Sequence, residues 1–318
     1  MNPITSIYRR LIISKYKIDN CIFCTYKNQS LNIDNFNNIV FLLKNTTYYH
    51  FGDLLFYIPL ILKLTQKKKI LLLLNKSQRD FFNFFIEENK NIIFLDDLSS
   101  LNEKGTLAIT FPYNIIDYKS KFNCILGLGL PDKKLNEQYP LFLLRQLSNF
   151  LGIKFIINEY EEILSNIKKS ISLRELPNVS NLRKEKKYVI VSPYLNSGWW
   201  RDILKLKMNK IISCAKMTSK KFDAQLVLIG HKNDKFPKNM HGCIDLRGLP
   251  ITDIMKICRG NNIISGVGFD NIWMHYFDLI NKEYLVLFRG RILKNNYLNH
   301  MNSINVSFFR GKEKKKYI

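Results

Sequence analysis

The sequence contains few cysteines, only six in 318 residues. A chain of this length can bury a full hydrophobic core, so it needs neither disulfides nor a structural metal for stability. Two cysteines form a single CxxC pair, Cys21 and Cys24, but no second pair and no spaced histidines follow nearby, as a zinc site requires. We therefore expect ordinary reduced thiols.

Long apolar runs are also missing. The longest run, Leu54 to Leu62, has about nine residues and contains Pro59, whereas a membrane-spanning helix needs about 20. The apolar stretch after Arg9 and Arg10 is too short for the corresponding region of a signal peptide. We expect a cytoplasmic protein, which can still contact the cytoplasmic face of the inner membrane.

Acidic residues are scarce, since 26 Asp and Glu oppose 49 Lys and Arg, which gives a formal net charge of +23. Such an excess favours an anionic partner, namely nucleic acid, an anionic membrane surface or a phosphorylated small molecule. AT-rich coding also enriches Lys, Asn, Ile and Phe, so coding bias explains part of this charge. Hydrophobic residues make up 46% of the chain, which excludes wholesale disorder.

Short apolar runs alternate with helix-like segments from about residue 38 onwards. In the first half, the pattern predicts strands at 38–43, 69–74, 91–95, 106–111 and 123–128, and helices at 54–63, 77–88 and 140–151. This alternation is typical of a doubly wound parallel sheet with helices on both faces. Residues 1–36 are polar and irregular, and we interpret them as an N-terminal appendage.

The pattern restarts after a polar stretch at 176–187, which we interpret as an interdomain linker. Strands are predicted at 188–191, 224–229, 262–265 and 284–288, and helices at 205–220, 251–259 and 271–279. The sequence therefore predicts an α/β protein with two Rossmann-like domains, at 37–175 and 188–300, and a basic tail at 301–318.

Residues 51–63 resemble the opening of glycosyltransferase family 9, the family of the bacterial heptosyltransferases. In that family a first strand is followed by Gly-Asp and two hydrophobic residues, then by a helix with a proline near its start and a lysine at its end. Gly52, Asp53, Pro59 and Lys63 stand at the matching positions. Three segments of the second half extend the resemblance over about residues 38–290.

Residues 226–234 resemble the family's strand that ends in glycine with an acid a few residues later, and 244–254 its Asp-Leu-x-Gly turn. Residues 264–275 resemble its G-V-D-[ST]-G-x-x-H signature. Here Gly268 and Phe269 are inserted before the acid, Asn271 replaces Ser or Thr, and Ile272 replaces Gly.

The resemblance implies a GT-B fold, in which two Rossmann-like doubly wound domains face each other across a cleft. It also implies an inverting transfer of sugar from a nucleotide-diphosphate sugar, bound by the second domain, to an acceptor bound by the first. The catalytic base would be Asp53, beside Gly52 on the acceptor side, with His50 as the rival base. Alternatively, Asp53 only caps the helix that follows it.

The resemblance places the donor sugar nucleotide near a set of second-half residues: Ser192, Arg201, Asp234, Asp270, Asn271 and His275. Arg201 is the nearest cation to the position where the family has a lysine. Three alternatives stay open, with Asp270 as a helix N-cap, His275 as a packed helix residue and Asp234 as an exposed turn acid. The sequence contains no Asp-x-Asp metal-diphosphate motif, so we expect no metal and no cofactor besides the donor.

These motifs identify neither the donor nor the acceptor. The donor is ADP-heptose or another nucleotide sugar. Acceptors compatible with the family are lipopolysaccharide core, O-antigen, capsule or protein. The lysine groups Lys15, Lys17 and 67–69 favour peripheral docking on the inner membrane, unless they form only a solvated face.

Other hypotheses are a basic nucleic-acid or anionic-surface binder, an inactive glycosyltransferase-like protein and a dinucleotide oxidoreductase. The last lacks a G-x-G-x-x-G fingerprint, since 127–129 and 266–268 are only fragments of one.

Overall fold

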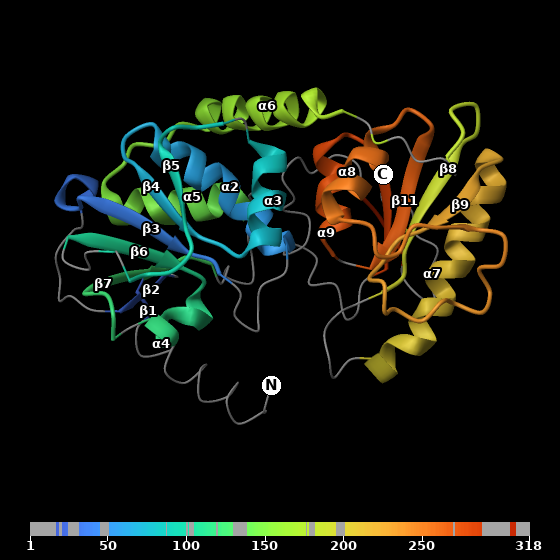
Figure 1. Ribbon diagram of the computed structural model, residues 1–318, viewed down its shortest axis with the longest axis horizontal. Coiled ribbons are helices and arrows are strands. Elements are labelled where there is room, and N and C mark those ends of the chain that lie inside the picture. The colour runs from blue at the N-terminus through green and yellow to red at the C-terminus, as the bar shows by residue number, and fades with distance from the viewer. Residues whose placement is uncertain are drawn as a thin grey trace. The chain divides into compact units, whose positions relative to one another are not determined.

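The computed structural model describes residues 17–18, 21–24, 32–44, 51–86, 88–99, 101, 105–118, 120–129, 139–175, 177, 182–194, 201–269, 271–287 and 306–309. The chain divides into two compact units, Met1–Ile171 and Ser172–Ile318. Each unit consists of one sheet with helices packed against it (Figure 1).

The sheet of the first unit is mostly parallel. Within the described residues it has seven strands, in the spatial order β1-β2-β7-β6-β3-β4-β5. Strands β3 to β7 pair in parallel, whereas β2 pairs antiparallel with β7 and β1 antiparallel with β2. The bounds are β1 (Lys17–Ile18), β2 (Cys21–Cys24), β3 (Asn38–Leu42), β4 (Ile70–Leu73), β5 (Ile92–Leu95), β6 (Thr106–Thr110) and β7 (Cys124–Gly127).

Helices cover both faces of this sheet. Tyr57 of α2 packs edge-on against Phe41 of β3 on one face, while Ile115 of α4 joins Val40 and Leu42 in a buried cluster on the other. Asn75 starts α3 through a reciprocal capping box with Gln78, which fixes where the helix begins. The helices are η1 (Ile33–Asn35), α2 (Phe51–Thr65), α3 (Lys76–Phe85), η2 (Pro112–Asn114), α4 (Ile115–Tyr118), α5 (Tyr139–Leu151) and α6 (Ile157–Leu173).

The sheet of the second unit is parallel throughout its described strands, in the order β10-β9-β8-β11-β12-β13. Counted from β8 as the first strand, this is 3-2-1-4-5-6, the order of dinucleotide-binding Rossmann folds. The elements are β8 (Tyr188–Ser192), α7 (Arg201–Phe222), β9 (Gln225–Leu228), β10 (Ile244–Asp245), α8 (Ile251–Arg259), β11 (Ile263–Phe269), α9 (Ile272–Leu279), β12 (Glu283–Leu287) and β13 (Val306–Phe309).

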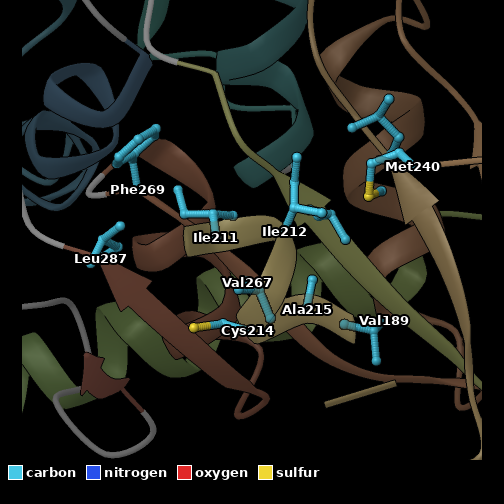
Figure 2. Close-up of a cluster of buried hydrophobic side chains, with 11 residues drawn as sticks. Val189, Ile211, Ile212, Cys214, Ala215, Met240, Val267, Phe269 and Leu287 are labelled. Atoms are coloured by element: carbon cyan, nitrogen blue, oxygen red, sulfur yellow. The ribbon is translucent and has the colours of Figure 1, made fainter. Parts of the chain in front are cut away.

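The core of the second unit lies between α7 and the sheet. Ile211 and Ala215 of α7 pack with Val189 of β8 and with Val267 and Phe269 of β11 (Figure 2). All five side chains are almost completely buried, so this helix–sheet contact contributes much of the hydrophobic stabilisation of the unit. The two strands that contribute to this contact, β8 and β11, are paired in parallel.

The predicted fold class, two doubly wound α/β units, is confirmed, and most predicted strands and helices occur within a few residues of their predicted bounds. The structure differs at both ends of the chain. Part of the segment interpreted as an appendage forms β1 and β2, and part of the basic tail forms β13. Both additions satisfy backbone groups of a sheet edge, which residue composition does not reveal.

Two helices, α4 and α6, are absent from the sequence-based prediction. The boundary between the units falls at 171/172, before the predicted linker.

Among the described residues, no helix combines the length and the hydropathy that a membrane crossing requires.

Candidate functional site

The strand order of the second unit reverses between β8 and β11. Chain order runs outward from β8 to β10, then returns to β11 on the other side of β8. In open parallel sheets, ligands bind at such a switch point, outside the carboxyl ends of the strands. Ser192, a predicted donor-site residue, is the last residue of β8, and Asn271 follows the end of β11. Both residues therefore lie at this edge.

Asn271 connects β8 to the start of α9. It is the N-cap of α9, and its side-chain oxygen accepts the backbone N–H of Trp273 at 3.0 Å. Its Nδ2 donates to Oγ of the buried Ser192 at 3.1 Å. The cap is therefore Asn271, and the alternative role of Asp270 as the N-cap is wrong. Asp270 itself lies outside the described residues.

The inserted residues of the signature belong to the sheet rather than to the loop. Gly268 and Phe269 extend β11 by pairing with Val286 and Leu287 of β12. The strand therefore continues four residues beyond its predicted end at Ser265. The loop between β11 and α9 is correspondingly short, which brings Asn271 close to Ser192.

Asp234 lies in the loop that follows β9. One of its carboxylate oxygens accepts the backbone N–H of His231 at 2.6 Å, and its own N–H donates to the carbonyl of His231 at 2.9 Å. Asp234 is half-buried and closes a tight turn at the carboxyl end of β9. It is thus a turn-forming acid, at the edge of the sheet where a nucleotide ribose binds in Rossmann folds.

Arg247 organises the same loops. It pairs with the carboxylate of Asp245 at 2.7 Å, donates to the backbone carbonyl of Asp234 and lies over the ring of Phe236. The hydrogen bond from Arg247 lowers the pKa of Asp245 below its ordinary range. Tyr194 lies nearby, and burial raises its pKa to about 12.

Tyr194 and Arg247 were not predicted as site residues. Their proximity to Asp234 depends on how the loops after β8, β9 and β10 pack, since Tyr194 also donates to the carbonyl of Lys235 at 2.8 Å. No local motif marks such contacts. The Asp-Leu-x-Gly resemblance at 244–254 was the only sequence signal near Arg247.

The structure places two further predicted donor-site residues, His275 and Arg201, on helices of the second unit. His275 lies in α9, one turn after the N-cap, and is half-buried. Arg201 is the first residue of α7, but its side chain is outside the described part of the structure. Whether Arg201 replaces the missing lysine therefore stays a prediction.

The first unit has its own switch point, between β3 and β6. The hydroxyl of Thr110, at the end of β6, donates to the carbonyl of Leu42 at 2.9 Å, and the Tyr57 hydroxyl donates to the carbonyl of Leu128 at 2.6 Å. The first bond joins the carboxyl ends of β6 and β3, and the second joins α2 to the residue that follows β7.

Gly52 and Asp53 lie in the first turn of α2, whereas the predicted helix begins only at residue 54. The helix therefore starts three residues earlier than expected, and Gly52 has no positive φ angle. The side chain of Asp53 and the whole of His50 are outside the described residues. Because α2 follows β3, the backbone of Asp53 belongs to the segment that leaves the carboxyl edge of the first sheet.

An open pocket of about 580 Å³ lies at the opposite edge of the second sheet. It is lined by Tyr188 and Gln225, at the amino ends of β8 and β9, and by the exposed cations Arg183 and Lys186. None of the predicted site residues lines it. Its two cations make it an alternative position for an anionic ligand in the second unit, although Asp245 also lines it.

No protein-family model and no curated protein sequence matches the chain. Solved structures do resemble it. A glycosyl transferase family 9 protein from Veillonella parvula has a TM-score of 0.53 at 12% identity, covering 88% of this chain and 87% of that one. ADP-heptose lps heptosyltransferase II from E. coli has a TM-score of 0.51 at 13% identity, covering 86% and 90%. The family resemblance in the sequence thus has a structural counterpart, and the chain has the fold of these two transferases.

Proposed function

We propose that the protein is a glycosyltransferase of the inverting, metal-independent type. It moves a sugar from a nucleotide-diphosphate sugar, ADP-heptose or another, to a bacterial surface glycan. The observation that carries this proposal is the switch point of the second unit, where Ser192 and Asn271 are hydrogen-bonded beside the start of α9. The likeness in fold to two transferases over most of the chain supports the same activity.

The second unit binds the donor nucleotide in this proposal. The start of α9 offers backbone N–H groups and the positive end of the helix dipole to the diphosphate. Ser192 adds a hydroxyl, and His275 and Arg201 follow on α9 and α7 as further donors to phosphate oxygens. Asp234, after the second strand of the Rossmann order, lies where an acid binds the ribose. Asp270 contacts the sugar or holds the loop.

The first unit binds the acceptor and supplies the base. The Asp53 carboxylate takes the proton of the acceptor hydroxyl as its oxygen attacks the anomeric carbon. The bond from that carbon to the diphosphate oxygen breaks, so the nucleoside diphosphate leaves and the configuration inverts. His50 is the alternative base, and Gly52 lies beside Asp53 on the acceptor side.

No metal is needed in this scheme, because the helix N-terminus and the cations stabilise the leaving diphosphate. Among the described residues, no three His, Cys, Asp or Glu side chains lie together as a metal site. The acceptor is lipopolysaccharide core, O-antigen or capsule, and its lipid anchor would bring the protein to the cytoplasmic face of the inner membrane.

A second candidate, an anionic-surface or nucleic-acid binder without catalysis, is favoured by the net charge of +23. It predicts binding that depends steeply on salt and not on the sugar nucleotide.

The proposal is tested by thermal unfolding in the presence of ADP-, UDP-, GDP- and CMP-linked sugars. A ligand that binds only the folded chain raises the melting temperature by mass action. We expect one diphosphate-linked class to raise it in a saturable way that persists at high salt. No shift with any sugar nucleotide, or an equal shift with all polyanions, would contradict the proposal.

A further inference from the structure

Tyr284 of β12 is completely buried beside the switch point of the second unit. It pairs directly with Gly266 of β11, and its ring packs against Phe277 of α9 at a centroid distance of 5.2 Å. A Cβ atom added to Gly266 or Gly268 would collide with the Tyr284 ring or hydroxyl. The two glycines therefore create the space in which this ring reaches the carboxyl end of β11.

The hydroxyl of Tyr284 donates to Oδ1 of Asn271 at 3.5 Å. The same oxygen accepts the N–H of Trp273 as the helix cap. With two donors directed at Oδ1, the amide of Asn271 has one orientation, and Nδ2 faces Ser192 Oγ at 3.1 Å. Tyr284, Asn271 and Ser192 thus form a chain of hydrogen bonds, which we call the switch-point relay. Its two ends, Tyr284 and Ser192, are buried, and Asn271 in the middle is half-buried.

The hydrogen bond with Asn271 determines the direction of the Ser192 hydroxyl proton. An amide NH₂ group can only donate, so Ser192 Oγ is the acceptor in the bond with Asn271. The hydroxyl proton of Ser192 is then directed away from Asn271. Because Ser192 ends β8 at the carboxyl edge of the sheet, this proton is available to a ligand at that edge.

We infer that Tyr284 and Asn271 are positioning residues that make the Ser192 hydroxyl a hydrogen-bond donor to an anionic oxygen of the bound diphosphate. This inference rests on the proposed function, since it assigns a role within the proposed donor site. The Asn271 amide matters for its polarity as well as its shape, because a carboxylate at that position would accept the serine proton instead.

The test measures the affinity of ADP, UDP and GDP by titration calorimetry for the wild type and for Tyr284→Phe, Asn271→Asp and Ser192→Ala. We expect about threefold weaker binding for Tyr284→Phe, whose bond is long, and at least about tenfold weaker binding for the other two. Asn271→Asp keeps a side-chain oxygen for the helix cap, so its melting temperature should stay near that of the wild type.

Tyr276→Phe is the matched control. The Tyr276 hydroxyl is also buried and donates to the carbonyl of Met255 at 2.8 Å, so this variant loses one buried hydroxyl bond as well. It should lose stability but bind the nucleoside diphosphate as the wild type does. If it weakened binding as much as Tyr284→Phe, the relay would be only structural support.

A double-mutant cycle tests whether Tyr284 acts through Ser192. In the Ser192→Ala background, Tyr284→Phe should cause no further loss of affinity. Independent, multiplicative losses would overturn the inference, as would wild-type affinity in both Tyr284→Phe and Asn271→Asp. Absence of any nucleoside diphosphate binding to the wild type would instead contradict the proposed donor site, and the inference with it.

Discussion

The amide of Asn271 donates a hydrogen bond to the hydroxyl of Ser192 across 3.1 Å, although 79 residues separate the two in the chain. The bond spans the switch point of the second sheet, because Ser192 ends β8 and Asn271 is the N-cap of α9. It joins two residues that the sequence had assigned separately to donor binding. The start of α9 is thereby held at one position relative to β8.

Asp53→Asn should abolish sugar transfer while donor binding stays nearly unchanged. The amide keeps the size of the side chain but cannot accept the acceptor proton, and general-base catalysis contributes about 10²–10⁴-fold to a rate. The measurement is transfer to a lipid-linked glycan, with nucleotide affinity determined in parallel. Asp80→Asn, an exposed carboxylate on α3, is the control and should transfer normally. Near wild-type transfer by Asp53→Asn would shift the role of base to His50.

Chelation by EDTA should leave transfer unchanged. The sequence has no Asp-x-Asp motif, and the proposed site stabilises the leaving diphosphate with N–H groups and cations. The rate is compared before and after EDTA, then after added Mg²⁺ or Mn²⁺. Loss with EDTA that either metal restores would contradict the metal-free mechanism.

Glu159→Ala should destabilise the first unit. The ammonium of Lys63 in α2 is buried, with 6% of its side chain exposed, and pairs with Glu159 of α6 at 2.7 Å. Removing the carboxylate leaves this cation buried and unpaired, which costs about 1–3 kcal/mol, less than for a fully buried pair because Glu159 is partly exposed. Urea unfolding measures the change. Asp34→Ala breaks the pair of the exposed Asp34 with the half-buried Lys68 at 3.8 Å and should change stability by less than about 0.5 kcal/mol.

The ion pair of Asp245 and Arg247 should make the stability of the second unit depend on pH. Arg247 lowers the pKa of Asp245 from its ordinary value of 3.8, so the folded chain binds this proton less readily than the unfolded chain. The stabilisation is therefore present above about pH 4 and is lost as the pH falls through the lowered pKa. Urea midpoints of wild type and Asp245→Asn should differ at pH 7 and converge in acid. A constant difference down to pH 2 would contradict this role.

Anionic vesicles should bind the protein at low salt and release it at high salt. Lys67 and Lys69 are exposed at the amino end of β4, and each cation near an anionic surface contributes about 1 kcal/mol. Flotation of Lys67→Glu/Lys69→Glu should show less bound protein than flotation of Lys216→Glu/Lys220→Glu, the exposed control pair on α7. Equal loss in both would indicate a response to net charge alone.

The main course of the fold was predictable because each buried parallel strand is a short apolar run, as in 70–73, 188–192 and 283–287. The hydrophobic pattern did not predict the strands whose formation depends on pairing with a distant strand. Strand β2, with the sequence CIFC, is stabilised by antiparallel pairing with β7 rather than by a local signal. Likewise, β11 continues through Gly266 and Gly268 because it pairs with β8 and β12, and Tyr284 fills the space that side chains would occupy.

Sequence motifs pointed separately to Ser192 and Asn271, and the structure brings these two residues together. The sequence did not reveal residues that contact these positions from a neighbouring strand or loop. Tyr284 and Arg247 lie in segments without a distinctive pattern, and their contacts arise from strand order and loop packing. Asn271, first noted as a departure from the family signature, proves to be a helix cap with a second hydrogen bond.

A crystal structure with the nucleoside diphosphate that binds in the thermal screen would locate the donor site of the second unit. We expect the diphosphate at the carboxyl edge of the second sheet, within hydrogen-bonding distance of the Ser192 hydroxyl and the first turn of α9. A diphosphate bound instead at the amino edge, in the pocket with Arg183 and Lys186, would contradict this expectation.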